Sequence, residues 1–152
     1  MVTGLDGRPP ASAAWLGGLG AIPFVGLSAA VLFLSGPVRV AAVQALLAYG
    51  AVILSFLGGV HWGLAMAGTD GADRDRLWLR LIVSVTPSLA AWAALLVGGR
   101  AGLFVLAASV AAMLWVDLRA TRLAQAPRWY PALRIPLTVV VVTALLVAAF
   151  AG

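Results

Sequence analysis

The sequence predicts an all-α integral membrane protein, a bundle of five transmembrane helices that forms a single domain over residues 1-152. Hydrophobic residues make up 63% of the chain and charged residues only 10%, and the mean hydropathy is +1.07. A soluble domain usually has a charged share of about 25%. The apolar residues also gather in five runs, separated by short segments rich in glycine, proline or arginine.

The first expected helix covers residues 13-34. About 20 residues are needed to cross a hydrocarbon core about 30 Å thick, whereas the apolar core of a secretory signal has roughly 7 to 15 residues. We therefore expect this run to be retained as a span. Pro23 lies within it and favours a kink. The segment Ser35-Gly36-Pro37 then favours a tight turn into the second helix.

The second expected helix, residues 41-67, is the element around which the others are arranged. No formal charge lies between Arg39 and Asp70. Small residues recur at four-residue spacing in both the first and the second helix, and such residues let two helix backbones approach closely in a bilayer. We therefore expect these helices to form a close hairpin. It would pack through Gly17, Ala21, Ser55, Gly59 and Gly63.

Three further helices are expected, at residues 77-97, 101-118 and 133-150. The segment Thr86-Pro87-Ser88 falls in the middle of the third helix, where proline frees a backbone carbonyl and favours a kink. Glycines at 98 and 99 turn the chain into the fourth helix, which is short and ends near Asp117. The fifth helix contains Arg134 in its first turn.

The arginines predict the orientation of these spans. Five spans place the two termini on opposite sides, and the side of the C-terminus then holds only Arg39 and Arg100. Cytoplasmic loops usually carry the excess of Lys and Arg, so we expect a bacterial inner (cytoplasmic) membrane protein with a cytoplasmic N-terminus and a periplasmic C-terminus. The arginines on the N-terminal side are Arg8, Arg74, Arg76, Arg80, Arg119, Arg122, Arg128 and Arg134.

The alternating direction of the helices brings four ionisable side chains to one depth, near the N-terminal side. A helix from residue 101 to 116 covers about 24 Å, less than the hydrocarbon core, which draws Asp117 toward the apolar region. Neither Arg119 nor Arg122 is at the spacing of three or four residues that forms a pair within a helix. We therefore expect Asp117 to pair across helices. The four side chains are His61, Arg80, Asp117 and Arg134.

This cluster has two interpretations, an ion pair that joins helices and a site for a ligand or a proton. A quinone headgroup or a lipid phosphate would be held by His and Arg donors beside the rings of Trp62, Trp115 and Trp129. Those rings also fit the ordinary aromatic belt of a membrane protein. Haem is disfavoured, because the chain has one His and no haem-attachment motif.

Other classes of site are disfavoured by composition. One His and one Asp do not make the usual three-ligand zinc site, so no metal site is expected. The absence of cysteine excludes disulfides, thiolate metal sites and thiol catalysis. The arginines lie at the ends of apolar runs and form no basic reading face, so no nucleic-acid partner is expected.

Two segments resemble a known family. They are Tyr49-Gly50 through Ser55-Phe56-Leu57-Gly58-Gly59-Val60-His61-Trp62-Gly63, and Trp129-Tyr130-Pro131-Ala132-Leu133-Arg134 before the last span. Both are similar to the family catalogued as Domain of Unknown Function 3429, which includes bacterial membrane proteins and a human mitochondrial transmembrane protein. The resemblance covers nearly the whole chain. It implies a small multi-helix inner-membrane protein and assigns no activity or catalytic residue.

The function we expect is that of a non-enzymatic accessory or assembly subunit of a larger respiratory or photosynthetic membrane complex. No complete catalytic set is recognisable, the small-residue stripes suit docking of other membrane-protein subunits, and the mitochondrial relative suggests an energy-transducing membrane by analogy. The alternative is a quinone- or lipid-binding membrane protein or enzyme that uses the polar cluster. A small transporter is third, since five spans show no evident repeat.

Overall fold

The computed structural model describes residues 7–67 and 74–151, and within these ranges it contains five helices and no strand. All five helices are long and apolar enough to cross a membrane, which confirms the predicted fold class. The helices are α1 (Ala11–Phe33), α2 (Gly36–Ala67), α3 (Arg74–Val97), α4 (Gly99–Arg122) and α5 (Tyr130–Ala151).

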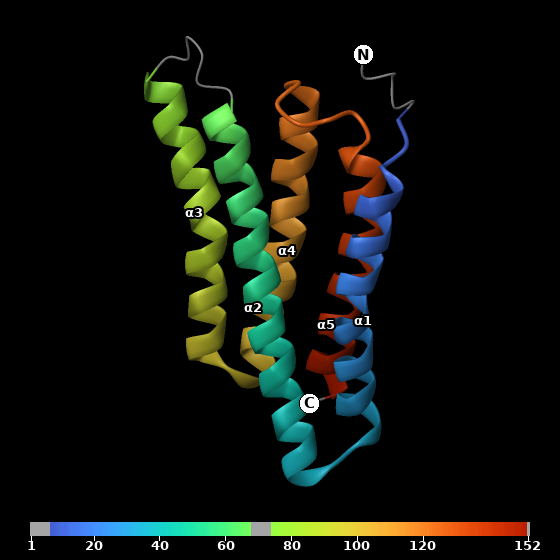
Figure 1. Cartoon of the computed structure of the whole chain (residues 1–152). Coiled ribbons are helices and arrows are strands. Elements are labelled where there is room, and N and C mark those ends of the chain that lie inside the picture. Colours follow the sequence, from blue (N-terminus) through green and yellow to red (C-terminus); the bar gives the residue numbers. More distant parts are fainter. Residues whose placement is uncertain (1–6, 68–73, 152) are drawn as a thin grey trace.

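The helices alternate in direction along the bundle (Figure 1). We call the end where α1 begins the upper end; α2 and α4 finish there, and α3 and α5 start there. The opposite, lower end holds the connections from α1 to α2 and from α3 to α4. Helices α1 and α2 are close at the lower end and diverge toward the upper end, where α4 and α5 follow between them.

Helix α4 is longer than the sequence predicted. It continues to Arg122 and has 24 residues, about 36 Å, so Asp117 lies inside the helix and not at its end. The expectation of a short fourth helix is wrong because Leu, Arg and Ala after Asp117 are good helix formers, and Arg119 and Arg122 suit the negative end of the helix dipole. The helix ends where Ala124 adopts a positive φ of 55° and Gln125 N–H donates to the carbonyl of Ala120.

The lower and central parts of the bundle have an apolar core. Glycine allows close contacts in it: a Cβ added at Gly102 would overlap with the Ala94 carbonyl oxygen of α3 and would lie 3.0 Å from Leu47 Cδ2. The α1–α5 contact includes one polar bond, from Ser28 Oγ to the Ala144 carbonyl at 2.8 Å. The largest fully buried apolar side chains are Phe24, Val31, Leu46, Leu54, Leu103, Leu106 and Leu145.

The small-residue stripe does not pack as expected. A Cβ added at Gly17 would lie 2.8 Å from Leu137 Cδ1 of α5, while one added at Gly59 or Gly63 would meet nothing within 4 Å. Ala21 and Ser55 are half-buried. The predicted α1–α2 contact is therefore wrong at Gly17, which meets α5, and at Gly59 and Gly63, which are exposed, and it stays a prediction at Ala21 and Ser55. Helices α1 and α2 diverge toward the upper end, where α2 finishes.

Other residues hold α1 to α2, and a neighbouring glycine holds α2 to α3. The Tyr49 hydroxyl donates to the Gly20 carbonyl at 2.9 Å, and the rings of Phe24 and Tyr49 lie 5.0 Å apart. On α2, the buried Gly58 faces α3, where a Cβ would overlap with the Ser84 carbonyl oxygen. Of the two adjacent glycines, Gly58 therefore makes the close helix contact and Gly59 does not.

Candidate functional site

Asp117 is the most deeply buried charged side chain among the described residues, with an exposed fraction of 0%. It lies on the face of α4 that also buries Met113 and Ala120, so its carboxylate points into the bundle. Moving an ionised carboxylate out of water costs on the order of several kcal/mol unless both of its oxygens find partners. The neighbouring helices supply those partners.

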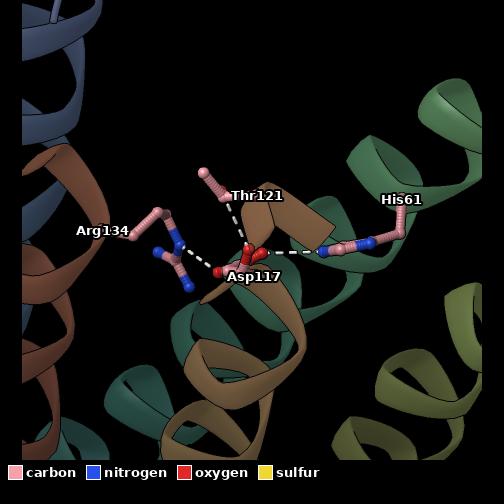
Figure 2. A network of polar contacts seen from close by, with 4 residues as sticks. All are labelled: His61, Asp117, Thr121 and Arg134. Atoms are coloured by element: carbon pink, nitrogen blue, oxygen red, sulfur yellow. Dashed lines mark hydrogen bonds and ion pairs between the residues drawn. The ribbon is translucent and has the colours of Figure 1, made fainter. Parts of the chain in front are cut away.

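Each oxygen of Asp117 has a partner from a different helix (Figure 2). His61 Nε2 of α2 lies 2.7 Å from Oδ1, and Arg134 Nε of α5 donates to Oδ2 at 2.5 Å. His61 and Arg134 are themselves buried, with exposed fractions of 8% and 7%. We call these three side chains the polar triad; they join α2, α4 and α5 near the upper end.

The protonation of the triad follows from its geometry. Arg134 is always cationic and balances the charge of the carboxylate. An ionised carboxylate only accepts hydrogen bonds, so His61 Nε2 must carry the hydrogen that faces Oδ1. Asp117 therefore fixes the tautomer and the orientation of the imidazole ring. The Thr121 hydroxyl adds support by donating to the Asp117 backbone carbonyl at 3.1 Å.

Arg80 does not join the polar triad. Its Nη2 donates to the Leu64 carbonyl at 2.9 Å. Leu64 is in the last turn of α2, where the final four carbonyls have no partner within the helix. Arg80 therefore caps α2 from α3, and three of the four residues that the sequence placed at one depth form a connected network.

A pocket opens beside the triad, between α2, α3 and α4, and we call it the upper pocket. Its volume is about 630 Å³. His61 belongs both to the wall of this pocket and to the triad. Arg80 and Arg119 also line the pocket. The guanidinium carbon of Arg119 lies 5.6 Å from the centre of the Trp115 ring. The remaining lining residues are Leu64, Leu79, Val83, Trp115, Val116, Ala120, Leu123 and Gln125.

Sequence reasoning found part of this pocket. Trp115 lines it, whereas Trp62 is exposed on α2 and Trp129 packs edge-on against the Tyr130 ring at 6.0 Å. Arg119 was missed as a site residue. The signal that would have found it is its spacing of four residues from Trp115, which puts both side chains on one face of α4.

The arrangement offers hydrogen-bond donors beside an apolar wall. Across residues 7–67 and 74–151, no group of three or more His, Cys, Asp and Glu side chains could hold a metal ion. His61 Nε2 is engaged by Asp117, which leaves Nδ1 as the remaining hydrogen-bonding group of that ring. Chemically, the upper pocket can bind acceptor oxygens through two guanidinium groups, whereas Nδ1 of the neutral His61 ring, with the hydrogen on Nε2, can accept a hydrogen bond.

Comparison with known proteins gives a family and relatives that include two transmembrane proteins. The family described as "Protein of unknown function (DUF3429)" matches residues 9–150. Transmembrane protein 69 of Xenopus tropicalis is 42% identical over 141 residues, which cover 90% of this chain and 53% of that protein. Transmembrane protein 69 of Mus musculus is 32% identical over 136 residues, 90% of this chain and 54% of that protein. The chain thus spans about half the length of these curated relatives. No solved structure matches it.

Proposed function

This chain belongs to the DUF3429 family, and we propose that, as a multi-pass membrane protein, it binds the polar head of an anionic membrane lipid in the upper pocket. One observation carries the proposal: His61, a buried residue that Asp117 holds in one orientation, forms part of the wall of a pocket that also contains Arg80 and Arg119. The protein would bind this ligand without catalysing a reaction on it.

The lining favours a phosphate over an uncharged headgroup. Two arginines line the upper pocket, and its described lining contains no carboxylate to neutralise them. Guanidinium groups bind phosphate oxygens through charge-assisted hydrogen bonds, which are about twice as strong as neutral ones. Apolar side chains such as Leu79 and Val83 line the same pocket and would contact acyl chains. An uncharged quinone headgroup would need neither positive charge.

The geometry of the triad also supports a binding role. Arginine and a carboxylate make their strongest contact as a bidentate pair, in which both oxygens are engaged. Here Arg134 uses Nε on Oδ2 alone, and Oδ1 is left to His61. A network that served only to join α4 to α5 would need no imidazole. The use of Oδ1 to orient a residue of the pocket wall fits a ligand site.

We further propose that the upper end faces the cytoplasm of a bacterial inner membrane. The eight arginines that the sequence assigns to the N-terminal side support this orientation. The upper pocket would then lie at the level of the inner-leaflet headgroups. Anionic lipids of a cytoplasmic leaflet are attracted to such basic surfaces at about 1 kcal/mol per Lys or Arg.

The direct test is ligand-induced stabilisation of the purified, delipidated chain. Phosphatidylglycerol in mixed micelles should raise the melting temperature more than phosphatidylcholine does, and Arg119→Gln should abolish most of that difference. Arg122→Gln is the matched control, because Arg122 is exposed on the same helix and does not line the upper pocket. Equal shifts with both lipids, or equal losses in both variants, would contradict lipid selection; stabilisation by a quinone analogue alone would favour the quinone.

A second candidate is the role of accessory or assembly subunit. It is favoured by the exposed Gly59 and Gly63 of α2, which present a small-residue face that none of the five described helices covers. A helix of a respiratory or photosynthetic complex would approach closely there. Isolation of this protein from its native membrane in mild detergent should then yield a larger complex, which the absorption spectrum of that complex's cofactors would identify. Gly59→Leu should release the chain from it and Arg119→Gln should not; co-elution of both variants would argue against this docking face.

A further inference from the structure

Two buried polar atoms of α5 have no hydrogen-bond partner. Among the side chains that the structure describes, only Arg134 Nη2 and Thr138 Oγ1 are both buried and unpartnered. Arg134 has an exposed fraction of 7% and Thr138 of 4%, so neither group reaches the surrounding solvent or lipid to any large extent. Buried polar groups in proteins are nearly always hydrogen-bonded, either to protein atoms or to ordered water.

Thr138 differs from other hydroxyls in the helices of this chain. Four of the other hydroxyls donate to a carbonyl three or four residues earlier in their own helix, and those of Ser28 and Tyr49 donate to a neighbouring helix. The Thr138 hydroxyl has no such local acceptor, which leaves it free to bond to a group outside its own helix backbone. The hydroxyls with a local acceptor are those of Ser84, Thr86, Ser109 and Thr121.

The two unpartnered groups lie on one face of α5. They are four residues apart, so they are one turn apart on the same side, and side chains tilt toward the start of a helix. The Thr138 side chain therefore tilts toward the turn that carries Arg134. Figure 2 shows that only Nε of the Arg134 guanidinium is joined to Asp117, which leaves the terminal nitrogens for other partners.

We propose that Arg134 Nη2 and Thr138 Oγ1 bind one internal water molecule, which completes the polar triad on the side of α5. A water accepts the hydrogen of Nη2 and exchanges a hydrogen bond with the hydroxyl, and internal waters typically make about three such bonds. An anion fits less well, because Asp117 already balances the charge of Arg134 and a second negative charge would be buried beside it. Val141 and Leu145, deeper on α5, are buried and apolar and end the hydrated region.

This inference goes beyond the proposed function. Neither Arg134 nor Thr138 lines the upper pocket, so the water site does not depend on any lipid bound there. Loss of lipid selection in the Arg119→Gln experiment would leave the internal water unaffected. Conversely, failure of the water site would leave the pocket in place.

The sign of the stability change in Thr138→Val tests the proposal. If a water is bound, valine removes one of its partners and should lower the melting temperature by about 2 to 4 °C. If the hydroxyl has no partner at all, valine removes an unsatisfied polar group at nearly constant volume and should leave the melting temperature unchanged or raise it. Thr138→Ser, which keeps the hydroxyl, should retain most of the stability. Thr143→Val, at an exposed position of the same helix, is the control.

A second measurement does not depend on a variant that folds. Water-edited solid-state NMR of the wild-type chain in bilayers should transfer magnetisation from water to the Thr138 side chain, and not to the buried Leu145. No transfer to Thr138, or an unchanged or increased melting temperature in Thr138→Val, would overturn the proposal.

Discussion

In the lower half of the bundle, neighbouring helices meet through apolar side chains and glycines, whereas in the upper half α2, α4 and α5 meet through the polar triad. The lower half needs no charge, because α1 and α2 are close there and Gly102 lets α3 and α4 approach. In the upper half α1 and α2 have diverged. A carboxylate on α4 that binds side chains from both neighbours bridges that wider spacing.

The comparison shows how the forces are divided within a membrane domain. Lipid tails are as apolar as leucine, so burial of apolar surface does not by itself drive helices together, and close packing or interhelical hydrogen bonds must do so. Packing suits the lower half, where backbones approach, and also the α2–α3 contact at Gly58. The triad joins α2, α4 and α5 through side chains, and it places His61 beside the upper pocket. The upper half is therefore both the polar half and the half with a candidate ligand site.

The largest expected effect is that of Asp117→Asn. The substitution leaves the Arg134 guanidinium buried without a counter-ion, and removing one partner of a buried ion pair typically costs about 3 to 5 kcal/mol of unfolding free energy. Unfolding of the purified chain by a denaturing detergent would measure it. The informative control is the double substitution Asp117→Leu with Arg134→Leu, which removes both charges and should recover much of the loss. A double variant as unstable as Asp117→Asn would mean that volume, and not the buried charge, matters in the upper half.

The lower half should be most sensitive at Gly102. In Gly102→Ala the new Cβ would overlap with the Ala94 carbonyl oxygen, which is backbone and cannot move aside cheaply, so we expect a loss of about 1 to 3 kcal/mol. Gly59→Ala is the control in the upper half, because a Cβ there meets nothing within 4 Å and alanine is the better helix former. Thermal unfolding of both variants would compare them. If Gly59→Ala costs as much stability as Gly102→Ala, another helix packs closely against Gly59, contrary to the structure.

The sequence predicts some of this division and misses the rest for identifiable reasons. Hydropathy and helix direction are enough to find the five spans and to bring His61, Asp117 and Arg134 to one depth, since alternating spans fix which ends meet. Periodicity shows which residues share a face of one helix and not which neighbour covers that face. Gly58 and Gly59 are adjacent and equally small, so only the packed bundle distinguishes the contact from the exposed position.

Arg80 shows the same limit for polar residues. Depth alone made it a partner for Asp117, yet in the structure it donates to the carbonyl of Leu64 at the end of α2. The length of α4 was missed because an aspartate after an apolar run looks like the end of a span. That aspartate is buried only because two other helices supply its partners, which a local sequence window does not contain.

His61→Leu should have an intermediate effect on stability. It removes the partner of Oδ1 but leaves Arg134 on Oδ2, so we expect a loss of about 1 to 2 kcal/mol in detergent unfolding, less than for Asp117→Asn. The same variant should also reduce the stabilisation by anionic lipid, because the upper pocket loses its oriented ring. Arg119→Gln should reduce only the lipid effect. Equal stability losses in these two variants would remove the distinction between a residue shared with the triad and one that only lines the pocket.

Ser28→Ala should have the smallest effect on stability, and it compares a neutral interhelical hydrogen bond with the charged contacts of the triad. The Ser28 hydroxyl donates to the Ala144 carbonyl at 2.8 Å and links α1 to α5 away from the triad. Interhelical hydrogen bonds of this neutral kind average about 0.6 kcal/mol in membrane proteins, because the same groups also find partners in the unfolded chain within the membrane. A loss near that value, measured by the same unfolding assay, is expected if stabilisation by polar contacts is concentrated at Asp117. A loss as large as that of Asp117→Asn would show instead that any buried polar contact in this bundle is critical, whether or not it involves a charge.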